Sequence, residues 1–420
     1  MNHVATPAPA ADPYSIPLDK IDVSNPALFQ LDLAGAYFKR LRKEDPVHYC
    51  AESAYGPYWS VTKYADIMHV DTNHQLFSAD HAVVLDDVQI QGGPDGQGVG
   101  IESFISMDPP RHDEQRKIVT PAVAPANLLR LQKSIRERTI RVVDELPLNE
   151  EFDWVDRVSI ELTTQMLATL VDFPFEERRK LSKWSDFTSG TPGDGVVSSW
   201  EEKNKVLFEC GERFTQLYNE RKKLPPQPDL ISMLAHSPVT ESMSPMQFLT
   251  NVLLLIVGGN DTTRNTMSGG VLALHRFPKE WEKLKANPAL VESLVPETIR
   301  WQTPVNYLGR RALCDTELGG KKIRKGDKVA MWYISGNRDE EAIERPDELI
   351  VDRKFPRQHL SFGFGVHRCV GNRLAEMQLR ILWEEILKRP FKRIEVLAEP
   401  KRIYSNVLRG ISHMPVKIHA

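Results

Sequence analysis

The strongest helical segment of this chain runs from residue 245 to 277, and its length constrains the fold more than any other feature. Ser244 precedes Pro245, and Gln247 follows three residues after the serine, which is the pattern of a capping box with proline in the first helical position. Pro278 ends the segment. At about 1.5 Å per residue the helix is roughly 50 Å long. A helix of that length crosses a whole molecule, so the other elements have to pack around it.

The remaining segments predict a fold that is mainly α with a small β region. Helical patterning extends from about residue 108 to 301 and returns at 370–390. Residues 58–62 are β-branched and aromatic and predict a strand. Short β-prone runs separated by glycines follow residue 305, including 329–334, and predict a small antiparallel region.

No repeat or clean boundary divides the chain, so we expect one domain over residues 18–420. Residues 1–17 are rich in alanine and proline and predict a flexible N-terminal arm. Residues 80–103 predict a long loop of the kind that often forms a functional lid. The Gly/Pro-rich stretches at 189–195 and 224–228 are hinges or helix–helix connections, and for the second a connection is favoured.

Composition excludes several classes of protein. The 54 basic and 57 acidic side chains give a net charge of −3, which argues against a nucleic-acid binder. The N-terminus lacks a secretory signal, and the aliphatic run Val252–Val257 is far shorter than the roughly 20 residues of a membrane span. We therefore expect a cytoplasmic protein. The four cysteines are too far apart for a disulfide framework or a zinc ribbon: Cys50, Cys210, Cys314 and Cys369.

The cysteine at 369 stands in a glycine-rich turn, Phe-Gly-Phe-Gly-Val-His-Arg-Cys-Val-Gly over residues 362–371. Glycines allow a tight turn that brings backbone N–H groups toward the sulfur, and a helix starting after Cys369 would point its positive end there. A thiolate held in this way suits a haem iron that activates dioxygen. The alternative is a buried structural cysteine. The spacing Phe362-x-x-Gly365-x-x-x-Cys369-x-Gly371 resembles the cysteine-ligand loop of the cytochrome P450 superfamily.

That resemblance implies a triangular helical body with haem b between the long central helix and the cysteine loop. Cys369 would supply the axial thiolate. In the long helix, Gly258 and Gly259 each cost roughly 1 kcal/mol relative to alanine, which indicates close approach of a ligand or of another backbone. The pair that follows them, Asp261 and Thr262, would carry protons from solvent to dioxygen. The alternative is a bent core helix in which Thr262 bonds back to a carbonyl one turn earlier.

The resemblance also implies which residues hold the cofactor and brace its loop. Met107-Asp-Pro-Pro starts a helix with Asp108 as its N-cap, and His112 and Arg116 share one face of it. Cofactor-binding residues would be His112, Arg116, Arg310, His367, Phe362 and Gly365. Solvated surface charges are the alternative for the basic ones. Glu297 and Arg300 match a structural E-x-x-R pair, with Arg353 as a candidate third member.

Three runs, at 107–117, 254–265 and 361–373, are similar to the soluble bacterial alkane and fatty-acid terminal hydroxylases. This resemblance implies hydroxylation of medium-chain linear alkanes or fatty acids at or near the terminal methyl. Another hydrophobic substrate, terpenoid or steroid-like, is the alternative. The candidate pocket residues, for which ordinary core packing is the alternative, are Leu254, Leu255, Gly258, Val305, Tyr307, Leu308, Val407 and Leu408.

The reaction needs O2 and electrons, and no flavin-type or iron–sulfur motif is present to supply the electrons. The resemblance implies a [2Fe–2S] ferredoxin with its reductase as partner. A basic surface would suit that acidic protein, with a solvated face as the alternative: Arg116, Lys117, Arg368 and Arg373. A peroxygenase or a haem sensor without turnover is disfavoured by the intact Asp261–Thr262 pair.

Overall fold

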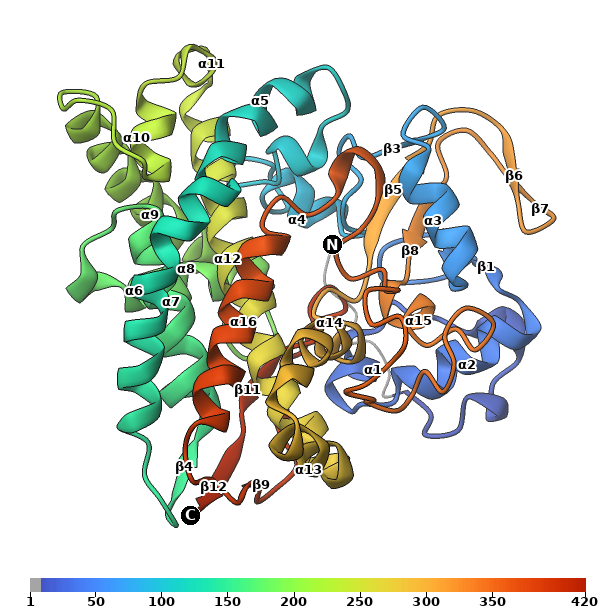
Figure 1. Ribbon diagram of the computed structural model, residues 1–420. Helices are drawn as coiled ribbons and strands as arrows, with labels where there is room; N and C mark the ends of the chain where they lie inside the picture. The colour runs from blue at the N-terminus through green and yellow to red at the C-terminus, as the bar shows by residue number, and fades with distance from the viewer. Residues whose placement is uncertain (1–8) are drawn as a thin grey trace.

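The computed structural model describes residues 9–420 and shows a helical body with a smaller β region at one side (Figure 1). The predicted fold class is confirmed. The helices are α1 Pro26–Gln30, α2 Ala34–Glu44, α3 Tyr64–Thr72, α4 Asp87–Gln91, α5 Arg111–Val119, α6 Pro125–Asp144, α7 Glu161–Leu170, α8 Arg179–Ser189, α9 Trp200–Arg221, α10 Leu230–Ala235, α11 Pro238–Glu241, α12 Pro245–Arg276, α13 Pro278–Ala286, α14 Val291–Gln302, α15 Tyr333–Gly336 and α16 Asn372–Leu387. The strands are β1 Val47–Cys50, β2 Tyr58–Val61, β3 Phe77–Ser78, β4 Glu151–Asp153, β5 Leu308–Ala312, β6 Thr316–Leu318, β7 Lys321–Ile323, β8 Lys328–Met331, β9 Arg393–Val396, β10 Lys401–Arg402, β11 Ile411–His413 and β12 Pro415–His419.

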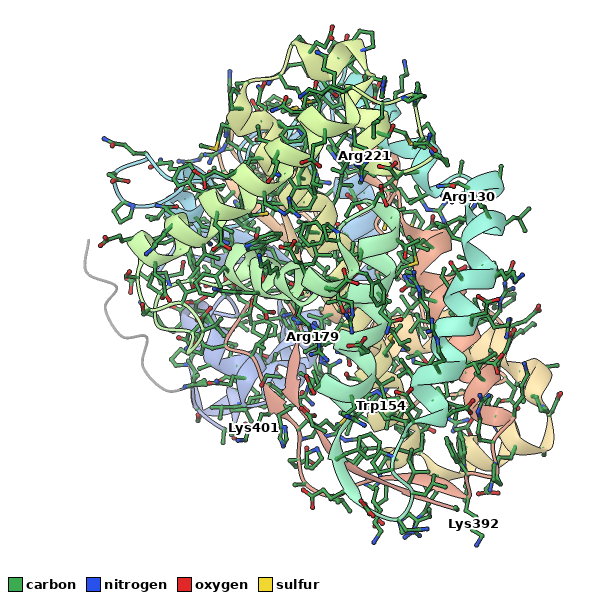
Figure 2. All side chains as sticks on the ribbon, turned by 90° about the vertical axis from the view of Figure 1, so that its left-hand side faces the viewer. Arg130, Trp154, Arg179, Arg221, Lys392 and Lys401 are labelled. Carbon is green, nitrogen blue, oxygen red and sulfur yellow. The ribbon has the colours of Figure 1, made fainter. Side chains whose placement is uncertain are left out.

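Helix α12 occupies the centre of the body, as its length predicts. The Ser244 side chain accepts from the backbone N–H of Gln247 at 3.1 Å, and Gln247 Oε1 accepts from the Ser244 N–H at 3.1 Å. The capping box is therefore confirmed. α12 packs against α7, α8 and α9 on one side and against α14 and α16 on the other. Figure 2 looks onto the first of these sides, where Arg130, Arg179 and Arg221 mark α6, α8 and α9.

The antiparallel region predicted after residue 305 is present in the pairs β5–β8 and β6–β7, and the main sheet as a whole is mixed. Its strand order is β1-β2-β8-β5-β3, with β2 and β8 parallel and the other neighbours antiparallel. The predicted strand at 58–62 is confirmed. The run at 329–334 is a strand only as far as Met331, and Tyr333 begins a helical turn. Trp332 makes the last hydrogen bond between these strands, since its N–H donates to Val61 O at 3.0 Å, and its ring stacks on Phe29, with centroids 5.9 Å apart.

The predicted N-terminal arm lies partly outside the described residues, which begin at residue 9. From there the chain packs onto α2. Tyr37 Oη donates to Ala10 O at 2.7 Å, and Arg40 Nη1 donates to Pro13 O at 2.6 Å and Ile16 O at 2.7 Å. The described part of the arm is therefore held in place by side chains of α2. No helix in the described part of the chain is long and apolar enough to cross a membrane.

The predicted loop at 80–103 contains the short helix α4, which Asp86 caps by accepting from Val88 N and Gln89 N. The break at 189–195 is a turn between α8 and α9. Asp194 closes that turn by accepting N–H bonds from Thr191, Val196 and Val197. The break at 224–228 connects α9 to α10, as favoured from the sequence.

Candidate active site

The cysteine loop is a tight turn that leads into α16. The Cys369 N–H donates to Phe362 O at 2.8 Å, which closes the loop on itself. Gly365 has φ +64°, and a Cβ there would lie 2.6 Å from Asp71 O, so only glycine fits. Gly371 has φ −91° and precedes the first residue of α16. The predicted helix start behind the cysteine is thus present.

Opposing effects act on the thiol of Cys369. Burial raises its pKa, while hydrogen bonds from the N–H groups of Gly371 and Asn372 and the charges of Arg116 and Arg368 lower it. The residue is nevertheless solvent-accessible, unlike the buried Cys50 and Cys210. An accessible sulfur that receives two N–H bonds at a helix start has the donor set of a thiolate metal ligand.

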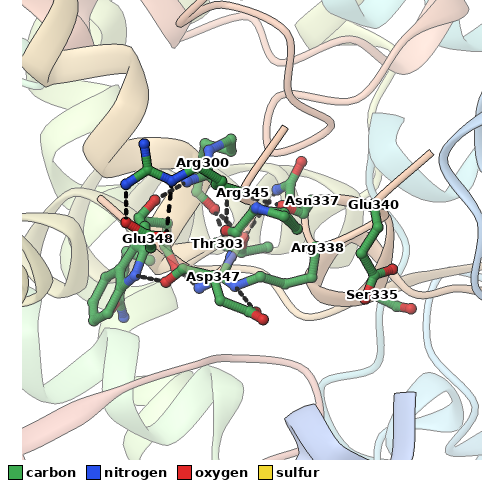
Figure 3. Close-up of polar contacts among 12 residues, drawn as sticks. Arg300, Thr303, Ser335, Asn337, Arg338, Glu340, Arg345, Asp347 and Glu348 are labelled. Atoms are coloured by element: carbon green, nitrogen blue, oxygen red, sulfur yellow. Dashed lines mark hydrogen bonds and ion pairs between the residues drawn. The ribbon is translucent and has the colours of Figure 1, made fainter. Parts of the chain in front are cut away.

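A buried ion network braces this loop. Arg300 Nε and Nη2 donate to the Glu297 carboxylate at 2.7 and 2.8 Å, and both side chains are fully buried. Arg353 Nε donates to the same carboxylate at 2.9 Å, so the candidate third member joins the pair. Arg300 also donates to backbone carbonyls of Asn337 and Glu348 (Figure 3).

Asn337 carries the network to the cysteine loop. Its Oδ1 accepts from Leu360 N at 2.7 Å, and its Nδ2 donates to Ser361 Oγ at 2.9 Å. Ser361 Oγ in turn donates to Ile299 O in α14 at 3.0 Å. The residues immediately before the loop are thereby fixed to the helix that carries Glu297 and Arg300.

The histidines expected to hold the cofactor's acid groups lie together. The rings of His112 and His367 are 4.4 Å apart, and Nε2 of each is buried without a hydrogen-bond partner among the described residues. Burial lowers the pKa of His112, and burial together with the charges of Arg310 and other cations lowers that of His367 to about 2. Arg116 reaches the loop from the same face of α5 as His112 and donates to Arg368 O. The unpaired ring nitrogens of His112 and His367, beside Arg116 and Arg310, suit the anionic carboxyl groups of the cofactor. The negative charge of those groups would favour the protonated imidazoles.

Arg310 has a carboxylate partner that the sequence did not indicate. Its Nη2 donates to Asp71 Oδ1 at 2.8 Å, and both side chains are buried. Asp71 Oδ2 accepts from Phe364 N at 2.7 Å and from Tyr333 Oη at 3.3 Å. Burial raises the pKa of Asp71, and Arg310 opposes that shift. Asp71 therefore ties α3 to β5 and to the cysteine loop.

Asp108 does not cap α5, contrary to the prediction from the sequence. The residue before α5 is Pro110, which makes no side-chain cap. The Asp108 carboxylate instead accepts from Ser78 Oγ and, at 3.0 Å, from Ala79 N. Asp108 therefore joins the start of α5 to β3. The two segments are about 30 residues apart, so the local sequence pattern does not predict this contact.

The two glycines of α12 have different surroundings. A Cβ on Gly258 would meet no atom within 4 Å, whereas one on Gly259 would lie 2.8 Å from Leu167 Cδ2. The first glycine therefore borders open space and the second allows α7 to pack closely. Thr262, one turn after Gly258, is partly accessible and donates to Gly258 O at 2.8 Å. The back-bond considered from the sequence is present, on a face of the helix that is open rather than packed.

Asp261 points away from that face, toward α8. Its carboxylate accepts from Ser185 Oγ at 2.9 Å and Ser189 Oγ at 3.1 Å, and it pairs with Arg264 Nη2 at 3.0 Å. Arg264 also pairs with the partly exposed Asp186 at 2.8 Å. Burial raises the pKa of Asp261. A polar path thus leads from the surface to the residue beside Thr262. The sequence indicated Asp261 but not the residues of α8.

A cavity of about 150 Å³ lies beside this part of α12. Of the predicted pocket residues, Leu254, Leu308, Val407 and Leu408 line it. The other lining residues are Val83, Val84, Gln89, Val99, Gly100, Ile101, Ser103, Ile105, Thr188, Ser189, Lys203, Leu207, Thr250, Leu253 and Val257. Leu254, Gly258 and Thr262 follow one another at four-residue spacing, so they share one face of α12.

Four predicted pocket residues do not line this cavity. Gly258 borders open space, as described, and Leu255 packs against the core. Val305 forms an isolated bridge with Leu408. Tyr307 is 1% exposed, and its hydroxyl accepts from Leu85 N at 3.0 Å. Its place on the pocket wall is therefore corrected: the ring packs on Trp332, with centroids 4.5 Å apart.

Residues 148–411, more than half of the chain, match the family described as Cytochrome P450. The chain belongs to the cytochrome P450 family. Its structure is similar to that of CYP153D17 from Sphingomonas sp. PAMC 26605, with a TM-score of 0.90 and 47% identity over 96% of this chain and 100% of that one. It is 36% identical to linalool 8-monooxygenase of Pseudomonas putida over 95% of this chain and 99% of the relative. It is 30% identical to a methyl-branched lipid omega-hydroxylase of Mycobacterium bovis over 98% of each chain.

The protein is thus a haem-thiolate monooxygenase, and it requires O2, a hydrophobic substrate and a redox partner. Haem b, held by a cysteine thiolate, supplies the reductive activation of O2. The residues described above fit that cofactor. The accessible sulfur of Cys369 and the orphaned nitrogens of His112 and His367 are the groups that haem iron and propionates need.

Proposed function

We propose that this cytochrome P450 hydroxylates medium-chain linear alkanes or fatty acids at or near the terminal methyl, with electrons from a [2Fe–2S] ferredoxin and its reductase. One observation carries the substrate class. The cavity beside α12 is small, about 150 Å³, and most of its wall is valine, leucine and isoleucine, with no aromatic residue among those described. Pockets for drug-sized ligands are usually larger, roughly 300–1,000 Å³. A slender aliphatic chain fits such a slot better than a fused-ring body.

The name of one relative, a methyl-branched lipid omega-hydroxylase, supports attack at a chain end. In this chain Leu254 and Val257 line the cavity, and Gly258 lies four residues after Leu254 on the same helix, where an added Cβ would meet no atom within 4 Å. A chain lying in the slot would present its end, rather than its middle, to the open face of α12.

The roles of the site residues follow from their contacts. Cys369 holds the haem, with His112, Arg116, Arg310 and His367 around its acid groups. Thr262 presents its hydroxyl on the open face of α12. Asp261 would receive protons through the hydroxyls of Ser185 and Ser189 and pass them toward that face, while Arg264 holds its carboxylate in place. A carboxyl whose pKa is raised by burial holds a proton more readily, which suits a relay.

The ferredoxin would bind on the cysteine side. Lys117, Arg368 and Arg373 are exposed there, and Arg116 lies beneath them with its guanidinium on the Arg368 carbonyl. An acidic partner would be attracted to this surface, and the attraction would weaken as salt is raised.

The experiment is a titration of the haem-loaded protein with dodecane and with dodecanoic acid, followed by product analysis with O2, ferredoxin and reductase. A low-to-high-spin shift and a product hydroxylated at the chain end support the proposal. A shift without chain-end product refutes the regiochemistry, and the absence of any shift refutes the substrate class.

A terpenoid substrate is the second candidate, favoured by the 36% identity to linalool 8-monooxygenase. Linalool in the same titration distinguishes the two. A spin shift with linalool but with neither linear compound would replace the first proposal by the second. A peroxygenase is disfavoured because the Asp261–Thr262 pair has an intact polar path to the surface.

A further inference from the structure

Lys203 lies in the first turn of α9 and is one of the residues that line the cavity. It is only 2% exposed. Its Nζ donates to Thr188 O at 3.0 Å and to Gly190 O at 2.7 Å, at the end of α8. An ammonium group has three N–H donors, so these two bonds leave one donor for another acceptor.

This cation has no carboxylate partner within 4 Å among residues 9–420. The acidic groups that influence it most, Asp86 and Asp194, are engaged elsewhere. Asp86 Oδ1 caps α4, and both oxygens of Asp194 accept backbone N–H bonds of the α8–α9 turn. The Trp200 ring, whose centroid is 5.3 Å from Nζ, provides the only aromatic contact described for it.

A buried unpaired ammonium is costly, and its position at the positive end of α9 adds to that cost. Burial lowers the pKa of Lys203 to about 8, so the group still carries its charge at neutral pH. Capping the carbonyls of α8 accounts for two donors but needs no charge. An anion that entered the cavity would balance this charge.

The neighbouring polar groups are compatible with a carboxylate at this end of the cavity. Gln89 Nε2 donates to Thr188 O at 3.3 Å, so the amide lies beside the same carbonyl that Lys203 contacts. Both side chains line the cavity, and the remainder of its wall is mostly aliphatic. One cation with an amide beside it, in an aliphatic slot, matches a molecule with one carboxylate and a hydrocarbon chain.

We propose that Lys203 anchors the carboxylate of a medium-chain fatty acid, so that this enzyme selects acids over alkanes of equal length. The inference rests on the proposed function, since it names which of the two linear substrate classes the cavity prefers. The hydrocarbon chain would extend along Leu207, Leu253 and Leu254 toward the open face of α12.

The test compares dissociation constants for dodecanoic acid and dodecane, measured by the spin shift and by calorimetry on the haem-loaded protein. The variants are Lys203→Met, which removes the charge, and Lys203→Gln, whose amide still serves the α8 carbonyls. Lys205→Met is the matched control, because Lys205 lies on the same helix, is exposed and does not line the cavity. We expect both Lys203 variants to bind dodecanoic acid about 10- to 100-fold more weakly, with dodecane and the control unchanged.

Four outcomes decide the matter. A selective loss of acid binding supports the anchor. If the wild-type protein binds both ligands and the Lys203→Gln variant binds the acid equally well, the anchor is refuted while the proposed function stands. If both ligands weaken equally in both variants, Lys203 has only a structural role, and the anchor is again refuted. If the wild-type protein binds neither ligand, the proposed function fails and the anchor fails with it.

Discussion

Replacing the adjacent glycines of α12 by alanine, one at a time, should change the free energy of unfolding in different directions. At Gly258 an added Cβ meets nothing within 4 Å. Alanine is favoured over glycine inside a helix by about 0.8–1 kcal/mol. Gly258→Ala should therefore stabilise the protein by about that amount.

At Gly259 the same methyl would lie 2.8 Å from Leu167 Cδ2. Leu167 is 2% exposed and belongs to the main core, so it has little room to move. Overpacking of this kind costs about 1–3 kcal/mol, which exceeds or cancels the gain of about 1 kcal/mol in helix propensity. Gly259→Ala should therefore be less stable than Gly258→Ala by about 1–3 kcal/mol.

The measurement is urea unfolding of both variants without haem, followed by circular dichroism. Shortening Leu167 to valine removes the contacted atom, so the cost of Gly259→Ala should shrink in a Leu167→Val background. Because Gly258 lies on the open face, only its variant should change the spin shift caused by substrate. The reasoning is refuted if Gly259→Ala is as stable as Gly258→Ala.

Three further predictions concern the cofactor and its loop. Cys369→Ala should lose the red-shifted absorption band of the reduced, carbon-monoxide-bound protein; a variant that keeps the band would show that another residue ligates the iron. Thr262→Ala should keep haem but release reducing equivalents as peroxide, and an unchanged yield of product per electron would exclude its role in proton delivery. Glu297→Gln leaves Arg300 and Arg353 without their carboxylate partner, at a cost of about 3–5 kcal/mol. The purified variant should therefore contain much less haem. The control Glu292→Gln, at an exposed position of the same helix, should contain the normal amount.

Local signals in the sequence predict the scaffold of the site. The capping box of α12, the glycine-rich turn before α16 and the Glu297–Arg300 pair each depend on residues a few positions apart, and the structure contains all of them. These features can be predicted from the sequence because a cap, a tight turn and an ion pair at i and i+3 each require particular residue types at fixed spacing.

Contacts between distant segments have no such spacing. Asp71 meets Arg310 across 239 residues and Phe364 across 293, and neither pairing leaves a trace in local periodicity. Tyr307 illustrates the same limit. Its position after α14 is compatible with a pocket wall. In the structure, however, its hydroxyl accepts a hydrogen bond from Leu85 N in the loop at 80–103, and its ring is buried in the core.

Lys203 is a further residue whose environment depends on contacts between distant segments. In the sequence it is one of several lysines on a helix, and its neighbour Lys205 is exposed, as lysines on helices usually are. The difference between the two comes from the end of α8, whose carbonyls receive the Lys203 ammonium and bury it beside the cavity. The turn that brings those carbonyls there depends on Asp194, whose two oxygens accept three backbone N–H groups and lie beyond ion-pair distance of the Lys203 ammonium. Thus the turn that buries the cation also leaves it without an ion-pair partner, which the proposed fatty-acid carboxylate would supply.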